Sequence, residues 1–522
     1  MDYDVIIVGA GHNGLVASFY LARAGLNVLV LEAKGMIGGS CVTEELIPGY
    51  RFSSCANALW ALRPKIAKDL ALNERGLKVE SRLALRLLQD GRYLLTGSLT
   101  HGDAAVELLN VQNEIAKFSA ADAAAYPRWR EFTTRITRIF GPHLLEKPPR
   151  LHEIYAGCTD PDDKKVLDAI MTNSIADLAD RFFESDVMRD VGVGADIGDP
   201  HDVGSGLLFA LMTAMGEYTE TGAGVDNGFV QGGMGRLTQL MGQAVSEQGV
   251  VIRTHAAVTR ILIESGKTSG VELASGETVR SRVVISNLDP KRTFLSLFAA
   301  SDLDYRFLDR VRHLQTHVAA GLKFHCALSE LPEFRVVGGL TEQQTRNALF
   351  FIAPNRAYRI AAWRAAAVGD LPAEPIVSGS FPSLFDPPLA PNGRYTMSAY
   401  VLWAPVRPRR GTWSERRAEM AECLIRMMDR YTINFRRSLI DYVLLTPSDL
   451  EQRNFLTDGN IHHVDGIPSQ LLWQRPMEEL AHYRAPIAGV YLCGAGTHPW
   501  GEVSGAPGHN AAHVVLADMG KG

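Results

Sequence analysis

The first residues whose types and spacing indicate a chemical function are three glycines near the N-terminus. Gly9, Gly11 and Gly14 follow a hydrophobic run in DYDVIIVGAGHNGL. Gly11 has no side chain to hold the backbone away from a pyrophosphate, and Gly14 lets a following helix close onto the preceding strand. The free N–H groups at the start of that helix, where His12 and Asn13 lie, attract phosphate. The spacing therefore predicts a phosphate-binding turn.

An acidic residue follows the glycines at a spacing typical of dinucleotide-binding sites. Glu32 and Ala33 end a second hydrophobic run, NVLVLEA, 21 residues after Gly11. A carboxylate at this point can accept hydrogen bonds from both hydroxyls of an adenosine ribose, and it disfavours a 2′-phosphate. Glycine turns alone are common, but the strand, the helix and the acid together predict a dinucleotide site.

A second group of candidate residues lies close to the C-terminus, in GTHPWGEVSGAP. His498 and Glu502 could each act as a base that takes a proton from a substrate. Trp500, between them, could pack over a cofactor ring or a substrate. Structural roles stay open as alternatives: His498 could orient backbone, Glu502 could cap the last helix or face solvent, and Trp500 could be a pocket wall.

Three separated segments have the strand–turn–helix pattern needed to position these residues. The first is the N-terminal segment. In the second, residues 228–290, Gly232, Gly233 and Gly235 open a helix, and four strand-like runs follow it. In the third, residues 489–519, YLCGAG reads as a strand that enters a glycine turn, and Pro507 suits the first turn of the last helix.

The stretch after Glu32, KGMIGGSCVTEELIPGYRF, carries a second glycine pair, Gly38–Gly39. With the two later segments, it resembles the extended fingerprint of the FAD-dependent amine oxidase and phytoene desaturase superfamily, and within it the phytoene-dehydrogenase-related proteins. The resemblance implies an α/β fold, in which a Rossmann-like FAD-binding domain of the GR2 type is interleaved with an α+β substrate domain built on a mixed sheet. Many members have Arg after the glycine pair; here Ser40 can offer only its hydroxyl and N–H.

The same resemblance implies that the dinucleotide is FAD. In the family, the residue at the position of Val258 contacts the adenine through its backbone, and the C-terminal segment passes the flavin ring. A helix that starts near Gly505 and Ala506 would point its positive dipole end at the N1–C2=O edge of the ring. The predicted cofactor-binding residues are Gly9, Gly11, His12, Asn13, Gly14, Glu32, Ala33, Gly38, Gly39, Ser40, Val258, Gly494, Ala495, Val503, Gly505 and Ala506.

The remaining segments are expected to form the substrate domain. We assign residues 1–60, 225–299 and 466–522 to the FAD-binding domain, and residues 61–224 and 300–465 to the substrate domain. The first substrate segment reads as largely helical. The second mixes strands with a long helix, which Thr412 and Glu415 would begin as a capping box. The apolar run at residues 206–218 is either a core helix or a lining of the substrate pocket.

These features predict an FAD-dependent oxidoreductase. The expected reaction removes a hydride from a C–H bond of a largely hydrophobic small molecule, as in a dehydrogenase or desaturase that turns a C–C bond into C=C. Two alternatives stay open: an oxidase of amines or alcohols that uses O₂, and a flavin-dependent isomerase with no net redox change. The expected electron acceptor is O₂ or a quinone.

Composition excludes several other classes of function. The net charge is −5, and the densest basic cluster, Arg407 to Arg410, is short, so no nucleic acid partner is expected. The cysteines are scattered without a CxxC pair, which predicts reduced thiols, no metal site and a cytoplasmic location. No leader segment and no apolar run of ~20 residues are evident. Peripheral contact with a membrane and the oligomeric state stay open.

Overall fold

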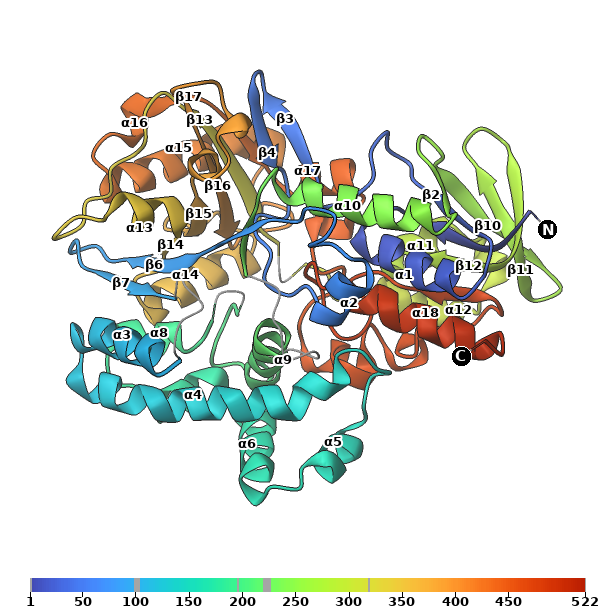
Figure 1. The fold of residues 1–522 in the computed structure, drawn as a ribbon, viewed down its shortest axis with the longest axis horizontal. Helices are drawn as coiled ribbons and strands as arrows, with labels where there is room; N and C mark the ends of the chain where they lie inside the picture. Colours follow the sequence, from blue (N-terminus) through green and yellow to red (C-terminus); the bar gives the residue numbers. More distant parts are fainter. Residues whose placement is uncertain (1, 98–103, 195–196, 219–226, 318–319, 522) are drawn as a thin grey trace.

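Two seven-stranded sheets form the framework of the molecule (Figure 1). The computed structural model describes residues 2–97, 104–194, 197–218, 227–317 and 320–521. The first sheet lies on the right of Figure 1, and the second lies at the upper left, above a layer of helices. The cavity described below lies between these two sheets.

The first sheet has the strand order β10-β11-β12-β1-β2-β9, and β18 also pairs with β12. The pairs around β1 are parallel, whereas β10, β11 and β12 form an antiparallel meander. The strands are β1 (Tyr3–Val8), β2 (Val28–Leu31), β9 (Val251–Arg253), β10 (Val258–Glu264), β11 (Lys267–Leu273), β12 (Thr278–Ser286) and β18 (Val490–Leu492).

Alternation along β1 gives the first sheet two buried faces. Val5 and Ile7 pack with the helices α1 (His12–Arg23), α10 (Met234–Glu247) and α18 (Ala506–Asp518). Ile6 and Val8 face the other way, toward the meander and the helices α11 (Pro290–Ser296) and α12 (Tyr305–Arg312). A strand that is covered on both faces must be hydrophobic at every position, which explains the unbroken apolar run in the sequence.

The second sheet has the strand order β17-β13-β16-β15-β14-β6-β7 and mixes parallel and antiparallel pairs. Its outer face packs against the long helix α15 (Trp413–Tyr431). Its inner face turns toward the first sheet. The strands are β6 (Leu83–Leu87), β7 (Tyr93–Thr96), β13 (Leu322–Leu328), β14 (Ala348–Ile352), β15 (Ile376–Ser380), β16 (Tyr395–Leu402) and β17 (Leu439–Leu445).

A helical layer lies below the second sheet in Figure 1 and has its own apolar core. Its helices are α3 (Ala104–Ala116), α4 (Ala120–Phe140), α5 (Leu151–Gly157), α6 (Pro161–Thr172), α7 (Ile175–Asp180), α8 (Asp186–Val191) and α9 (Ser205–Glu217). The apolar run singled out in the sequence is α9, and its residues Leu207 to Leu211 belong to this core. The next residue, Met212, reaches the cavity described below.

Short elements connect these layers. Two small two-stranded antiparallel sheets are also present: β3 (Thr43–Ile47) forms a hairpin with β4 (Tyr50–Ser53), and β5 (Val79–Ser81) pairs with the sequence-distant β8 (Gly228–Val230). The remaining α-helices are α2 (Pro64–Asp69), α13 (Glu342–Asn347), α14 (Arg356–Ala367), α16 (Phe435–Ser438) and α17 (Pro447–Asn454).

A buried charge cluster ties the helical layer to the second sheet. Asp190 of α8 accepts hydrogen bonds from Arg86 of β6 and from Arg359 of α14, whose Nε lies 2.7 Å from Asp190 Oδ1. Asp190 and Arg359 have no solvent exposure. Burial by itself raises the pKa of Asp190, but the two guanidinium charges outweigh it and hold the pKa below its usual range. The cluster is therefore ionised and fully paired.

The predicted fold class is confirmed: a Rossmann-like sheet is interleaved with an α+β region on a mixed sheet. Strands of the first sheet come from residues 3–31, 251–286 and 490–492, and those of the second come from residues 83–96 and 322–445. The predicted domain boundary at residues 224 and 225 lies outside the described residues.

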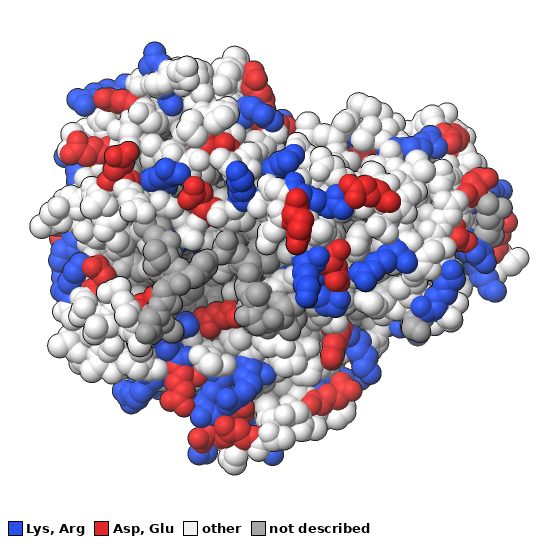
Figure 2. Space-filling view, in the orientation of Figure 1, with Lys and Arg blue, Asp and Glu red and all other residues white. Residues whose placement is uncertain are grey.

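The surface carries both charge signs. Figure 2 shows Lys and Arg interspersed with Asp and Glu over the face in view, without a continuous basic patch among the described residues on that face. Within the described ranges, no helix combines the length and the apolar character needed to cross a bilayer.

Candidate active site

A cavity of about 700 Å³ lies between the two sheets. One half is lined by the ends of β1 and β2, by the start of α1 and by the segments that follow β12. The other half is lined by the inner faces of β13, β14, β15 and β16. We call these the nucleotide half and the chamber.

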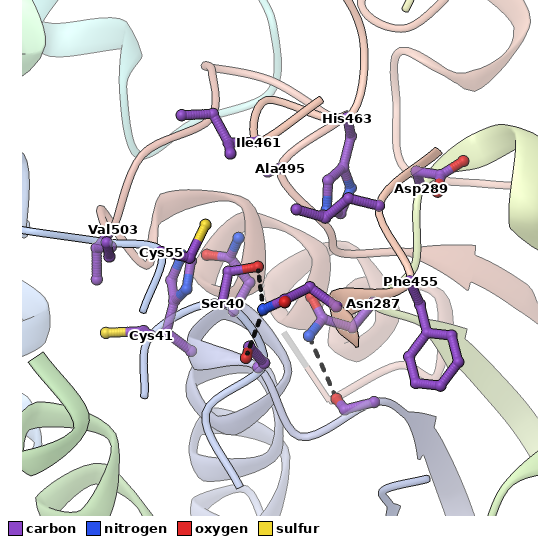
Figure 3. Close-up of a pocket in the computed structure, with 18 of the residues that line it drawn as sticks. Ser40, Cys41, Cys55, Asn287, Asp289, Phe455, Ile461, His463, Ala495 and Val503 are labelled. Carbon is purple, nitrogen blue, oxygen red and sulfur yellow. Dashed lines mark hydrogen bonds between the residues drawn. The ribbon is translucent and has the colours of Figure 1, made fainter. Parts of the chain in front are cut away.

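The glycine turn after β1 forms the floor of the nucleotide half. Gly9 has φ +97°, a conformation that favours glycine. A Cβ on Gly11 would lie 2.8 Å from Asn287 Nδ2, so the turn has no room for a side chain. Asn287 Nδ2 donates a hydrogen bond of 3.2 Å to the Gly9 carbonyl and holds the turn in place (Figure 3).

The helix α1 begins at this floor. Gly11 is its N-cap and provides no side-chain cap, and Gly11, His12 and Asn13 line the cavity. The first backbone N–H groups of a helix have no partner within the helix, and the macrodipole makes this end positive. The end of α1 thus suits the diphosphate of a dinucleotide.

Glu32 stands at the end of β2, where the sequence predicts a ribose ligand. Its Oε2 accepts a hydrogen bond from the Ala10 N–H, and its Oε1 accepts one from the Lys34 N–H, both at 2.9 Å. These bonds orient the carboxylate. Each oxygen keeps a further acceptor site, so Glu32 can still bind two hydroxyl groups.

The second glycine pair lies beside the first turn. Gly39 and Ser40 line the cavity, and Gly38 lies behind them, where a Cβ would be 2.7 Å from Thr238 Oγ1. Asn454 Nδ2 donates to the Gly39 carbonyl and to Ser40 Oγ, each at 3.4 Å (Figure 3).

The end of the nucleotide half that Val258 lines also carries an arginine and an aromatic ring. The guanidinium of Arg292 lies 5.3 Å from the ring centroid of Phe455, and both residues line the cavity. This combination of a backbone edge, a ring and a planar cation suits a purine.

The residues that are present fit FAD. Besides the glycine floor and Glu32, several buried polar atoms of cavity-lining residues have no partner in the described part of the chain: His12 Nε2, Asn13 Oδ1, Asn57 Oδ1 and His463 Nδ1. Buried polar atoms are normally satisfied. A ligand with many hydrogen-bonding groups, such as a dinucleotide, would satisfy them.

The predicted cofactor-binding residues divide into two sets. One set lines the cavity: Gly9, Gly11, His12, Asn13, Glu32, Ala33, Gly39, Ser40, Val258, Ala495 and Val503. The other set lies behind the lining: Gly14, Gly38, Gly494, Gly505 and Ala506. Gly505, for example, packs against Ile66 and Val16, where a Cβ would lie 3.0 Å and 3.2 Å from their side chains.

Of the three predicted catalytic residues, Glu502 lines the cavity. Its Oε2 accepts a hydrogen bond of 3.1 Å from Trp60 Nε1, and its Oε1 lies 3.7 Å from His462 Nδ1. Burial and the charge of Arg475 lower the pKa of His462 to about 3, so the imidazole is neutral beside the carboxylate. Glu502 has φ +66°, which is strained for any residue but glycine.

His498 and Trp500 do not line the cavity, because both are packed behind its wall. The His498 Nε2 lies 2.8 Å from the His143 carbonyl, and burial lowers the His498 pKa to about 4. The Trp500 ring lies 4.8 Å from the His462 ring and 4.2 Å from the Arg475 guanidinium. Their contacts support the loop that presents Glu502.

The chamber also contains charged and aromatic residues that sequence reasoning missed. Lys323 of β13 is buried, and its Nζ lies 3.9 Å from the ring centroid of Tyr400 on β16. Arg82 and Trp60 line the same half. Lys323 had a local signal, a lone charge inside the apolar strand GLKFHCALS; Arg82, Trp60 and Tyr400 had none.

Strand alternation explains why these residues face the chamber. Phe324 and Cys326 of β13 pack in the core beneath α15, so Lys323 points to the opposite face. In the same way, Phe350 is in that core, whereas Leu349 and Phe351 line the chamber. The apolar walls of the chamber are Trp60, Met212, Leu349, Phe351, Tyr400 and Leu402.

Comparison with known families gives one clear result. The model of the flavin containing amine oxidoreductase family matches residues 14–325, which is more than half of the chain. The matched part includes most of α1, Glu32 and the segment around Val258.

Similarity to curated proteins extends over the whole length. The chain is 34% identical to pyridine nucleotide-disulfide oxidoreductase domain-containing protein 2 of Mus musculus, over 99% of this chain and 94% of that protein. It is 25% identical to the hydroxyneurosporene desaturase of Cereibacter sphaeroides, over 99% and 98%. It is also 24% identical to the lycopene-forming phytoene desaturase of Pseudescherichia vulneris, over 98% and 99%.

Solved structures share the fold at low identity. A putrescine oxidase variant superposes with a TM-score of 0.60 at 15% identity, covering 99% of this chain and 98% of that one. The cyclohexylamine oxidase of Brevibacterium oxydans superposes with a TM-score of 0.55 at 14% identity, covering the whole of both chains.

Proposed function

The chain belongs to the flavin containing amine oxidoreductase family and is an FAD-dependent oxidoreductase, and from this premise we propose that it is a dehydrogenase or desaturase of a largely hydrophobic small molecule. In the proposed reaction, two hydrogens leave neighbouring carbons, and a C–C bond becomes C=C. When bound, FAD supplies the acceptor for the hydride.

The observation that carries this proposal is a carboxylate in an apolar chamber. Glu502 lines the same cavity as the apolar side chains of Trp60, Met212 and Phe351. Apolar walls of this kind suit a hydrocarbon body, and the carboxylate offers a proton acceptor inside the space. Relatives named hydroxyneurosporene desaturase and phytoene desaturase, which align over nearly the whole chain, support the same reaction type.

We assign each residue of this chain a part in the reaction. Glu502 takes the proton from the carbon beside the one that loses the hydride. Trp60 orients Glu502 through its Nε1–H, and the neighbouring His462 is neutral. The residues from β14 and β16 exclude water and hold the substrate close to the nucleotide half.

We further propose that the cofactor is held by the discontinuous segments 1–60, 225–299 and 466–522, and the substrate by residues 61–224 and 300–465. The origin of the strands of the two sheets supports this division. Within the first group, α1 binds the diphosphate, Glu32 binds the ribose and Val258 contacts the adenine.

The test is anaerobic reduction of the purified flavoprotein by largely hydrophobic small molecules, namely terpenes, other alkanes and alkenes, and carboxylic acids with an apolar body. The expected result is bleaching of the visible flavin absorbance, with a product that lacks two hydrogens, and reoxidation by a quinone or by O₂. Hydrogen peroxide release with amines or alcohols, and no bleaching with any of these hydrophobic compounds, would instead identify an oxidase. Turnover without any change in flavin or acceptor would identify an isomerase. Either of these results would overturn the proposal.

A further inference from the structure

The chamber contains two cationic side chains that the proposed reaction does not use. Lys323 is buried, with its ammonium group against the Tyr400 ring at 3.9 Å. Arg82 lines the chamber immediately before β6, the strand that pairs with β14 and its chamber residues Leu349 and Phe351. Among the described residues that line this half, Glu502 supplies a single carboxylate.

Arg82 differs from the other arginines around the second sheet. Arg86, four residues along the chain, and Arg359 are both paired with the buried carboxylate of Asp190. The Arg82 guanidinium makes no hydrogen bond or ion pair with the residues that the structure describes. Burial lowers the pKa of Arg82, and the charge of Glu502 only partly offsets this effect.

An unpaired cation in a largely apolar pocket is costly unless a ligand compensates it. The planar guanidinium matches a carboxylate, which it can bind through two parallel hydrogen bonds. The second positive charge, on Lys323, favours an anion in the same space and disfavours an ammonium group.

On these grounds we propose that Arg82 anchors a carboxylate of the substrate, so that the substrate is an amphipathic carboxylic acid rather than an amine or a pure hydrocarbon. This inference rests on the proposed function, because it concerns the same chamber. The apolar body of the acid packs against Trp60, Met212 and Phe351, and its carboxylate pairs with Arg82. Glu502, which carries the same charge as that carboxylate, keeps it away from the reacting end.

The experiment measures binding rather than turnover. The FAD-loaded protein is titrated with three probes of one skeleton, 3-phenylpropanoate, 3-phenylpropanol and 3-phenylpropylamine, and binding is followed by the perturbation of the visible flavin spectrum and by calorimetry. We expect the carboxylate to bind at least tenfold more tightly than the alcohol and the amine. Equal or weaker binding of the carboxylate, or no binding of it at millimolar concentration by either method, would overturn the proposal.

Variants identify the anchor. R82Q removes the charge and is expected to weaken carboxylate binding by about 10- to 100-fold, as for a hydrogen bond to a charged group, with alcohol binding unchanged. R82K keeps the charge but loses the bidentate geometry, so its affinity for the carboxylate should lie between those of the parent protein and R82Q. R346Q is the matched control, because Arg346 is an exposed partner of Glu80 near the same sheet. Unchanged carboxylate binding by an FAD-loaded R82Q variant would overturn the proposal.

The two proposals fail separately. If carboxylates bind through Arg82 but neither carboxylic acids nor hydrocarbons reduce the flavin, the proposed reaction fails and the anion subsite stands. If neutral hydrocarbons reduce the flavin and R82Q has no effect on their binding or on that of the carboxylate probe, the reaction stands and the subsite fails.

Discussion

Single residues decide how closely the cofactor can approach the backbone. Gly11 has an ordinary φ of −68°, so its importance is the space that a Cβ would fill rather than its conformational freedom. That space adjoins Asn287, which also holds the Gly9 carbonyl. A side chain here would displace the turn and, in the proposed binding mode, the diphosphate.

We therefore expect Gly11→Ala to weaken FAD binding at least tenfold, which corresponds to about 1.4 kcal/mol. The measurement is the FAD dissociation constant of the refolded or deflavinated protein, from flavin fluorescence quenching. Gly157→Ala is the control, because no atom lies within 4 Å of the added Cβ and φ is not positive there. An unchanged dissociation constant in Gly11→Ala would show that the diphosphate does not lie over this turn.

Glu502 is a second single residue for which we propose a specific role, that of the base. Glu502 lines the cavity and accepts a hydrogen bond from Trp60, although its backbone has a positive φ. A positive φ costs conformational free energy for a residue with a side chain. Strain of this kind persists where the surrounding structure imposes it, often at functional sites.

Glu502→Gln keeps the shape of the side chain and its acceptor toward Trp60, but removes the base. We expect the rate of anaerobic flavin reduction by substrate to fall about 10²- to 10⁴-fold, the usual contribution of a general base. The flavin content should stay at the level of the parent protein, and the exposed Glu74→Gln serves as control. A Glu502→Gln variant that reduces its flavin at the parental rate would exclude this residue as the base.

Among the secondary-structure elements, helix ends are the best determined by local sequence. The sequence predicts that one helix begins at the first glycine turn and another at Gly232 to Gly235. In the structure, α1 follows its N-cap Gly11 and α10 follows its N-cap Gly233. It also places a capping box at Thr412 and Glu415. In the structure, Thr412 Oγ1 accepts from the Glu415 N–H, and Glu415 Oε2 accepts from the Thr412 N–H at 2.7 Å, so this prediction is confirmed.

The cap of α15 gives a prediction about stability. Thr412→Ala removes an N-cap acceptor and should lower the free energy of unfolding by about 1 kcal/mol, whereas Thr412→Ser should retain most of it. Urea unfolding followed by circular dichroism measures the difference. Because α15 packs on the outer face of the second sheet, FAD binding should be unaffected. Equal stability of the alanine and serine variants would show that the box contributes nothing.

At the scale of the whole molecule, burial holds several imidazoles neutral, among them those of the cavity-lining residues His12 and His463. Burial lowers the pKa of these histidines to about 3 or 4, below the ordinary value of 6.5: His12, His325, His462, His463, His498 and His509. At neutral pH none of them carries a charge, so their burial is tolerated.

This burial makes folding stability depend on pH. Below pH 6.5 these histidines bind protons in the unfolded chain but not in the folded chain. Stability that is present above this pH is therefore lost as the pH falls toward 4. Each histidine contributes up to about 1.4 kcal/mol per pH unit. We expect the free energy of unfolding by urea to fall steeply between pH 7 and pH 5.

Two variants check the origin of this acid sensitivity. His498→Asn should reduce the slope, whereas His313→Asn should not, because the His313 side chain is 77% exposed. A free energy of unfolding that stays constant from pH 7 to pH 5 would show that the buried histidines do not control acid stability.

The sequence by itself determined the features that depend on short-range geometry. The glycine turn, the acid at the end of β2 and the starts of α1, α10, α15 and α18 each follow from spacing within a few tens of residues. Backbone sterics, helix capping and phosphate binding at a helix end act over such distances, so they leave a readable pattern. The assignment of FAD came instead from the resemblance of three separated segments to a known family.

Only the tertiary structure decided what faces the chamber. Trp60 and Glu502 are hydrogen-bonded across 442 positions, and Arg82 and Lys323 meet them from two further segments. The tertiary structure also shows that His498 and Trp500 lie behind the cavity wall, although they are close to Glu502 in sequence. Which side of a strand or loop faces a cavity depends on packing against distant elements, and no local pattern records that choice.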